Sequence, residues 1–267
     1  MTGTLFSIII LGRSFFTVKT TEGNIFMKFL VIRHGDPDYA VDGLTERGKQ
    51  EAEALAPYLE SLEVRHIYSS SMGRAVATAQ PTAARLHLPV IQFDWAREIS
   101  GRYEPVPGER RAAFNIPGSD LRSIAPEPPY PIDYARFSLY EEEQIEARIQ
   151  GLKEGINALF AEYGYIREGS RYRLENPSGD VVALFCHDGF GRTLVSYLLG
   201  LPILAGWSSL FLKTSSVTSF VMESYDDRYA VPRMIAMSDT THIRLAGLED
   251  NYRGLWINSA DRWKRLN

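Results

Sequence analysis

The sequence has 267 residues, more than one domain usually contains, but a common length for an α/β fold that forms one unit with insertions. Its 29 Lys and Arg residues stand against 33 Asp and Glu residues, so bulk electrostatics favour neither a nucleic-acid nor a membrane partner. Cys186 is the only cysteine, which excludes an intrachain disulfide framework and a cysteine-rich metal site, and is typical of a reducing, cytoplasmic compartment.

Residues 1–26 need separate treatment. The apolar run from Leu5 to Leu11 is too short to span a bilayer, and it lacks the basic region and the small-residue cleavage site of a secretory signal. Met27 stands two residues before the first core strand. We therefore expect one domain over 27–267, with residues 1–26 as an added strand, a mobile extension or an overcalled start.

The first predicted elements alternate between strand and helix. The apolar run Phe29 to Ile32 is typical of a buried parallel strand. Apolar residues at i, i+3, i+4 and i+7 then predict a helix of roughly four turns with Thr45 as its N-cap. A short strand over Val64 to Tyr68 and a helix over Gly73 to Leu86 follow, and Pro81 is expected to kink or split that helix.

The later segments continue the alternation around one long interruption. Residues from about 101 to 140 lose periodicity, and we expect an insertion that lies over the strand ends as a lid or pocket wall. The alternation predicts an α/β fold with three α/β/α layers around a mostly parallel sheet. The other predicted segments are a strand over 88–93, a helix over 141–163, a polar loop over 164–180, a strand over 181–186, a helix ending at Gly200, and a possible hairpin of strands over 216–222 and 233–237.

Side chains able to bind and transfer a phosphoryl group follow the predicted strands. Arg33 and His34 close the first strand, and His187 closes the strand over 181–186. Arg74 begins the helix after the second strand, and Glu98 follows the third. Active sites of open α/β sheets lie at the carboxyl ends of their strands, so these five residues are expected on one side of the sheet.

The ordered set of motifs is more specific than any one of them. Arg33-His34-Gly35, Leu44-Thr45-Glu46-Arg47-Gly48, the segment Tyr68 to Ala79 (YSSSMGRAVATA), Glu98 and His187 together resemble the histidine phosphatase superfamily, in its phosphoglycerate-mutase-like branch. The resemblance covers most of residues 27–245 and is thin between about 101 and 140.

The resemblance implies a metal-independent phosphomonoesterase that needs no cofactor and acts on a small phosphorylated metabolite. His34 would be the transiently phosphorylated nucleophile, Glu98 the general acid and then the base, and Arg33, Arg74 and His187 the groups that hold the phosphoryl oxygens. Physical chemistry agrees, because a neutral imidazole is nucleophilic near pH 7 and guanidinium groups match phosphate oxygens in pairs. Glu104 and Asp94 are rivals of Glu98 for the acid. The sequence leaves the substrate and the oligomeric state open.

The chain also departs from the family pattern. Asp36 to Ala40 stands where relatives often carry a Thr and an Asn that help to hold phosphate, and these carboxylates would repel the ligand unless they face away. Asp188 replaces the glycine that commonly follows the second histidine. His242 lies in a stretch similar to one near the pocket rim of relatives.

Two alternatives remain open. A phosphoglycerate mutase would share the five residues but would need a second anion site, for which Arg97, Arg102 and Arg110-Arg111 are candidates. An inactive phosphate-binding module would have lost the nucleophile or an arginine, and all are present. A metal hydrolase is disfavoured because the 5 histidines are dispersed along the chain.

Overall fold

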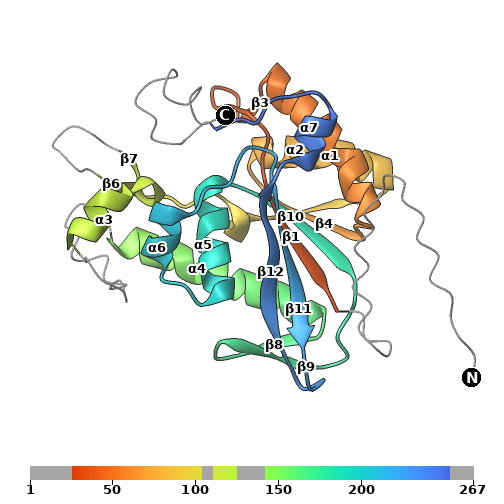
Figure 1. Ribbon diagram of the computed structural model, residues 1–267, viewed down its shortest axis with the longest axis vertical. Coiled ribbons are helices and arrows are strands. Elements are labelled where there is room, and N and C mark those ends of the chain that lie inside the picture. The colour runs from red at the N-terminus through yellow and green to blue at the C-terminus, as the bar shows by residue number, and fades with distance from the viewer. Residues whose placement is uncertain (1–25, 104–110, 125–141, 253–267) are drawn as a thin grey trace, which may run out of the picture.

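The structure, a computed structural model, describes residues 26–103, 111–124 and 142–252 (Figure 1). The expectations for residues 1–25 and for most of the 101–140 insertion lie outside the described residues. The described part is built on a mixed sheet of eight strands with helices packed against it. In sheet order the strands are β5 (Val90–Phe93), β4 (His66–Ser70), β10 (Val181–Cys186), β1 (Lys28–Arg33), β11 (Val217–Ser224), β12 (Tyr229–Asp239), β9 (Arg171–Leu174) and β8 (Tyr165–Glu168).

The sheet has a parallel half and an antiparallel half. Strands β5, β4, β10 and β1 run parallel, and their carboxyl ends therefore meet at one edge. From β1 onward through β11, β12, β9 and β8 the pairing is antiparallel. The predicted hairpin near the C-terminus is confirmed as β11 and β12, although both strands are longer than the pattern indicated.

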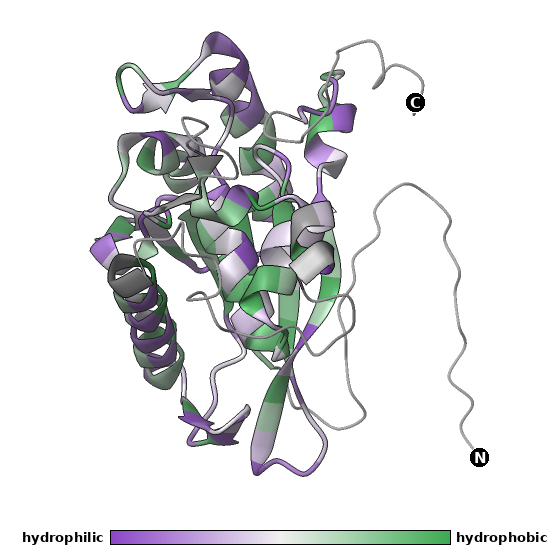
Figure 2. Cartoon of the chain, turned by 90° about the vertical axis from the view of Figure 1, so that its left-hand side faces the viewer, coloured by the Kyte–Doolittle hydropathy of each residue, from purple (hydrophilic) through white to green (hydrophobic). Residues whose placement is uncertain are grey.

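The helices cover both faces of the sheet, as the sequence predicted (Figure 1). Alternate side chains of β1 explain the layering, because Leu30 and Ile32 pack with α1 and α2 whereas Phe29 and Val31 pack with α4 and α5. Hydrophobic residues concentrate on the central strands (Figure 2). The helices are α1 (Glu46–Ser61), α2 (Gly73–Leu86), α3 (Gly118–Ile124), α4 (Glu142–Glu162), α5 (Asp188–Leu199), α6 (Ile203–Ser209) and α7 (Thr241–Leu245), with the 3-10 turns η1 (Asp94–Ala96) and η2 (Ala113–Asn115).

Two short strand pairs complete the described residues. Strands β2 (Pro37–Asp38) and β3 (Gly43–Leu44) form a small hairpin after β1, and β6 (Arg102–Tyr103) pairs with β7 (Arg111–Ala112). After β3, Thr45 caps α1 as predicted, because its hydroxyl accepts from the Gly48 N–H at 3.0 Å. Pro81 lies inside α2 without splitting it, since a proline removes one backbone donor and a helix can continue through that loss.

The prediction of a polar loop over 164–180 is wrong in part, because this segment contains the hairpin of β8 and β9. Its strands carry many charged side chains, yet Tyr165 and Tyr172 are fully buried. Gly169 takes a positive φ of 62° in the turn between them. The charges that suggested a loop pair with each other, as Arg173 does with Glu168 at 2.6 Å.

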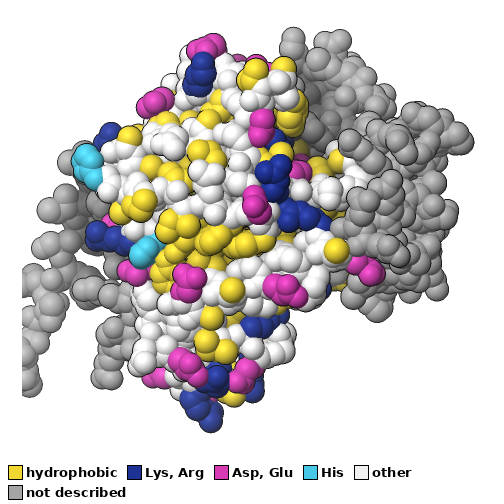
Figure 3. All heavy atoms as spheres, turned by 180° about the vertical axis from the view of Figure 1, so that it is seen from behind, with side chains coloured by type: hydrophobic (Ala, Val, Ile, Leu, Met, Phe, Trp, Pro, Cys, Tyr) yellow, Lys and Arg dark blue, Asp and Glu magenta, His cyan; other side chains and the backbone are white. Residues whose placement is uncertain are grey.

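On the face that Figure 3 shows, described side chains of one charge sign do not cluster. Figure 3 shows basic and acidic side chains interspersed around a central band of hydrophobic ones. Among the described helices, none is both long enough and apolar enough to cross a membrane.

Replacing each of two glycines of α4 by alanine should change the stability in opposite directions. A Cβ at Gly155 would lie 2.2 Å from the Trp95 ring, whereas a Cβ at Gly151 meets nothing within 4 Å. We expect Gly155→Ala to destabilise the protein by roughly 1–3 kcal/mol through overpacking. Gly151→Ala should stabilise it by about 0.5–1 kcal/mol, because glycine is a poor helix former. Urea unfolding of both variants measures the difference, and equal midpoints would show that the two helix faces are packed alike.

Candidate active site

The parallel half of the sheet places two histidines side by side. Strand β1 pairs with β10 so that Arg33 lies opposite Cys186. The next residues, His34 and His187, leave the sheet at the same edge, and their ring centroids are 5.2 Å apart. Strand β4 ends at Ser70 on this edge. The structure thus brings together the two histidines that end different strands.

His34 is fixed by its backbone and by one ring nitrogen. Its N–H donates to the Cys186 carbonyl at 2.9 Å, and its own carbonyl accepts from the Ser215 N–H at 3.1 Å. Nδ1 lies 2.8 Å from the Gly35 carbonyl oxygen, and because a carbonyl can only accept, Nδ1 carries the proton. In the neutral ring the lone pair is therefore on Nε2. The Gly35 N–H donates in turn to Thr78 Oγ1 at 2.9 Å, which ties this turn to α2.

His187 is fully buried and is tied to the end of β4. Its Nε2 lies 2.8 Å from Ser70 Oγ, which also accepts the Met72 N–H at 3.2 Å. Its Nδ1 is buried and has no hydrogen-bond partner among the described residues. Burial lowers the pKa of His187 well below its usual value, and the nearby His34 and Arg74 lower it further. The ring is therefore neutral near pH 7 and has one nitrogen available for a ligand.

Two buried guanidinium groups flank the histidines, and each has a carboxylate partner. Arg33 Nη1 donates to the Leu212 carbonyl and lies 3.9 Å from Asp188 Oδ1. Arg74 Nη1 donates to Asp42 Oδ1 at 2.5 Å. The side chains of Arg33 and Arg74 are 5% and 8% exposed, so these pairings compensate charges that water does not reach.

Glu98 reaches the site from the loop after η1 and contacts the first turn of α5. Its carboxylate accepts backbone N–H groups of Ile99 at 2.9 Å, Phe190 at 2.7 Å and Gly189 at 3.2 Å. Burial raises the pKa of Glu98, and the Asp188 carboxylate raises it further, although the three N–H bonds act in the opposite direction. Glu98 thus keeps its proton to higher pH than an ordinary glutamate does.

Comparison with known proteins agrees with this geometry. Residues 29–114 match the sequence profile of the histidine phosphatase superfamily (branch 1). The matched segment belongs to this superfamily. It contains four of the five predicted site residues, and the fifth, His187, comes later in the chain, directly after β10.

A curated relative gives a second sequence match. A 2,3-bisphosphoglycerate-dependent phosphoglycerate mutase of Thermoplasma acidophilum is 35% identical over 72 residues, which are 23% of this chain and 36% of the relative. This match therefore spans about a third of the relative's own length.

Two solved structures resemble the chain over most of its length. Phosphoserine phosphatase from Entamoeba histolytica, in complex with 3-phosphoglyceric acid, has a TM-score of 0.54 at 20% identity and covers 81% of this chain and 99% of its own. The mycobacterial glucosyl-3-phosphoglycerate phosphatase has a TM-score of 0.51 at 22% identity and covers 79% of this chain and 98% of its own. At these identities the likeness shows the fold, and the predicted α/β fold class is confirmed.

The acidic residues after Gly35 do not face the histidine pair. Asp36 accepts from Thr45 Oγ1 at 2.8 Å and from Asn251 Nδ2 at 2.9 Å. Asp38 accepts from the Ala40 N–H at 3.0 Å. The carboxylate that does reach Arg74 is Asp42, which the sequence motifs did not reveal. Its contact with Arg74 depends on the β2–β3 hairpin, which two-residue strands do not reveal in a sequence.

Within the described residues, neither the alternatives to Glu98 as the acid nor the candidates for a second anion site form a side-chain hydrogen bond or ion pair with the five central residues. Asp94 accepts from Ser71 Oγ at 2.5 Å on the surface, and Glu104 lies outside the described residues. Arg97 donates to Ser71 Oγ at 3.1 Å, whereas the side chains of the other candidates for a second anion site, Arg102, Arg110 and Arg111, lie outside the described residues. Among the residues that the structure describes, no group of three or more His, Cys, Asp or Glu could hold a metal ion.

His242, predicted near the pocket rim, is instead buried close to the backbone of His34. Its Nε2 is 3.0 Å from Ser215 Oγ. The Ser215 N–H donates to His34 O, so the pair supports the backbone of His34. Burial lowers the pKa of His242 to about 4, which makes it a neutral packing group near pH 7. Ser215 itself has a φ of 59°, an uncommon conformation for a residue with a side chain.

Removing the charge of Asp42 should raise the affinity of the site for an anion. Because its carboxylate neutralises Arg74, Asp42→Asn should strengthen the binding of inorganic phosphate about 3–10-fold. Isothermal titration with phosphate at fixed ionic strength measures this. Asp38→Asn is the matched control, since it removes the same charge from the same hairpin at a residue whose carboxylate bonds to Ala40. Equal changes in both variants would show that only net charge matters.

Proposed function

We propose that the protein is a metal-independent phosphomonoesterase that acts through a phosphohistidine on His34. The observation that carries this proposal is the convergence of two buried imidazoles, 5.2 Å apart, with two buried guanidinium groups at one sheet edge. A monoester phosphoryl group needs neutralisation of its oxygens and an in-line nucleophile, and this set supplies both. Imidazole and guanidinium groups perform these tasks without a metal ion.

In the first step His34 Nε2 attacks phosphorus. The N–P bond forms as the bond from phosphorus to the ester oxygen breaks, and the departing oxygen takes a proton from Glu98. Arg33, Arg74 and the unpartnered Nδ1 of His187 hold the phosphoryl oxygens during this transfer. The raised pKa of Glu98 supports its role as the acid, because the carboxyl group must be protonated when the substrate arrives.

In the second step water replaces histidine. Glu98, now a carboxylate, takes a proton from a water molecule whose oxygen attacks phosphorus, and the N–P bond breaks. Inorganic phosphate leaves and His34 returns to the neutral ring with its proton on Nδ1. The bond from Nδ1 to the Gly35 carbonyl holds this tautomer through both steps.

The structural neighbours support a small phosphorylated metabolite as the substrate. One is named as a phosphatase of phosphoserine and is bound to 3-phosphoglyceric acid, and the other is named as a phosphatase of glucosyl-3-phosphoglycerate and has been seen with inorganic phosphate. A mutase is the second candidate, because the curated relative is a phosphoglycerate mutase. Such an enzyme returns the phosphoryl group of the phosphohistidine to a sugar acid instead of to water.

Hydrolysis of p-nitrophenyl phosphate in the presence of EDTA tests the proposal. His34→Ala should lose at least about 10³-fold of the activity, since no other group takes over the nucleophile. Glu98→Gln should lose about 10²–10⁴-fold with alkyl phosphates and less with p-nitrophenyl phosphate, whose leaving group needs no proton. Turnover only after addition of bisphosphoglycerate with a phosphoglycerate would favour the mutase instead.

The pH dependence tests the acid. Burial and, after it, Asp188 raise the pKa of Glu98, and because the acid must be protonated, activity should fall as pH rises through that pKa. Asp188→Asn removes the like charge, lowers the pKa of Glu98 and moves the alkaline limb of the kcat profile to lower pH. Asp188→Glu keeps the charge and should keep the limb in place. An unmoved limb in Asp188→Asn would mean that another group sets it.

A further inference from the structure

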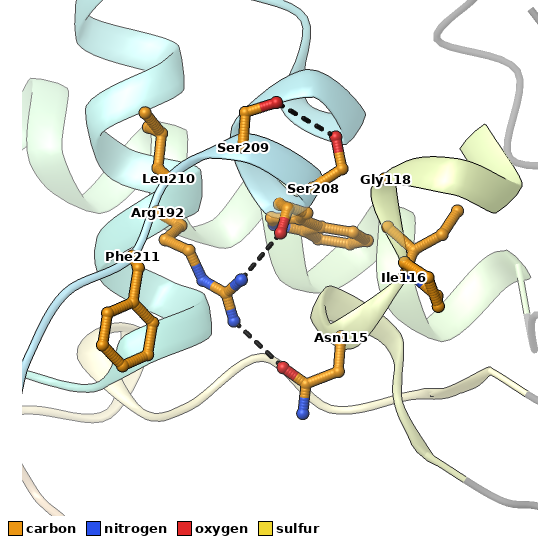
Figure 4. A pocket seen from close by; sticks show the side chains of 10 residues that line it. Asn115, Ile116, Gly118, Arg192, Ser208, Ser209, Leu210 and Phe211 are labelled. Carbon is orange, nitrogen blue, oxygen red and sulfur yellow. Dashed lines mark hydrogen bonds between the residues drawn. The ribbon is translucent and has the colours of Figure 1, made fainter. Parts of the chain in front are cut away.

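A pocket of about 270 Å³ lies beside the histidine site and has no part in the chemistry described so far. Two chain segments that contact each other form its walls, one running from η2 into α3 and the other from the end of α6 into the following loop (Figure 4). Its volume is just below the range of about 300–1,000 Å³ that is usual for ligand sites, which suits a small group. The lining residues are Asn115 to Gly118, Arg192 and Trp207 to Phe211.

The pocket adjoins the proposed phosphoryl site through Arg33. The guanidinium carbon of Arg33 lies 5.8 Å from the centre of the Phe211 ring, which lines the pocket. Arg33 also donates to the carbonyl of Leu212, the next residue. On the other side Asp188 contacts Arg33 at 3.9 Å and Arg192 at 2.9 Å. A group attached to a phosphoryl held by Arg33 is therefore one side chain away from the pocket.

Arg192 gives the pocket its charge. It donates to the Trp207 carbonyl at 2.7 Å and to Asn115 Oδ1 at 3.1 Å (Figure 4). It also donates to Asp188 Oδ2 at 2.9 Å. These bonds fix the plane of the guanidinium, which is 5% exposed, and its Nε has no hydrogen-bond partner among the described residues. A buried donor without a partner is a site for an acceptor atom of a ligand.

The charge around Arg192 favours an anion. None of the lining residues is acidic. Behind them, the Asp188 carboxylate is shared between Arg33 and Arg192, and Glu98 is a second carboxyl group that acts on Arg192. With Glu98 protonated, as the proposed first step requires, two guanidinium groups against the Asp188 carboxylate leave a net positive charge at this place. Ile116, Leu210 and Phe211 add apolar walls, which suit the carbon atoms that carry the anion.

We propose that this pocket is the leaving-group subsite and that it selects phosphomonoesters whose alcohol carries a carboxylate. The proposal rests on the proposed phosphatase function and names its substrate class. Arg33 would hold the phosphoryl group, while Arg192 would meet the carboxylate at the other end of the same small molecule. The bonds to Trp207 and Asn115 pre-orient the guanidinium, so binding needs little further ordering of the side chain.

Matched substrate pairs test the proposal. 3-Phosphoglycerate differs from glycerol 3-phosphate, and phosphoserine from phosphoethanolamine, by the carboxylate. Wild-type protein should show a kcat/KM at least about tenfold higher for the carboxylate member of at least one pair. Equal values within both pairs, or a preference for an aryl ester such as 1-naphthyl phosphate over both carboxylates, would overturn the subsite.

A charge placed at the pocket tests its position. Ser209 lines the pocket and is exposed, so substitutions there should fold. Ser209→Glu should lower the carboxylate preference about tenfold, and less so at high salt, whereas Ser209→Gln, of the same size, should leave it within about twofold. Thermal unfolding of both variants checks that each is folded. Equal effects of Glu and Gln would place the carboxylate elsewhere.

Binding to the His34→Ala variant separates this proposal from the function. Titration of that variant with 3-phosphoglycerate and glycerol 3-phosphate reads the carboxylate preference without turnover. Tighter binding of 3-phosphoglycerate, lost in His34→Ala/Ser209→Glu, supports the subsite even if wild type hydrolyses nothing. Hydrolysis of p-nitrophenyl phosphate with equal binding of the two ligands would leave the phosphatase standing and remove the subsite.

Discussion

The parallel pairing of β1 with β10 is the constraint on which the site depends. It places Arg33 opposite Cys186, and the bond from His34 N–H to the Cys186 carbonyl continues the ladder one residue past the strand. Because side chains alternate across a sheet, Arg33 follows Phe29 and Val31 toward α5, while the turn after His34 bonds to α2. A register slip of one residue would exchange these faces and would separate the guanidinium from Asp188.

Burial of positive charge is the second constraint. An unpaired guanidinium is costly inside a protein, and both Arg33 and Arg74 are nearly inaccessible to water. Asp188 and Asp42 compensate these charges, and in the proposed site the same carboxylates would compete with a phosphoryl group for the guanidinium donors. At these two pairs the carboxylate that stabilises the protein without ligand therefore weakens its affinity for a ligand. In this way Asp188, a departure from the family motif, can coexist with Arg33, a residue of that motif.

The sequence predicted those features that depend on local pattern. Strand-end histidines, the cap at Thr45 and the layers of the sheet follow from short-range periodicity and from the rule that parallel strands share an edge. The sequence did not predict the hairpin of β8 and β9, because its charges pair across strands and its two buried tyrosines lie in otherwise polar segments. The sequence did not predict the contacts of Asp42 and Arg192 either, since each is made between segments that lie far apart in the chain.

Asp188 shows how a single substitution in a motif can divide tasks between two arginines. Its Oδ2 lies 2.9 Å from Arg192, whereas its Oδ1 lies 3.9 Å from Arg33 and accepts no hydrogen bond from the described residues. The closer contact holds Arg192 in one orientation beside the pocket. The longer contact, to Arg33, belongs to the guanidinium that we propose holds the phosphoryl group. A glycine at this position would remove the ion pair of Arg192 and the charge that, after burial, raises the pKa of Glu98.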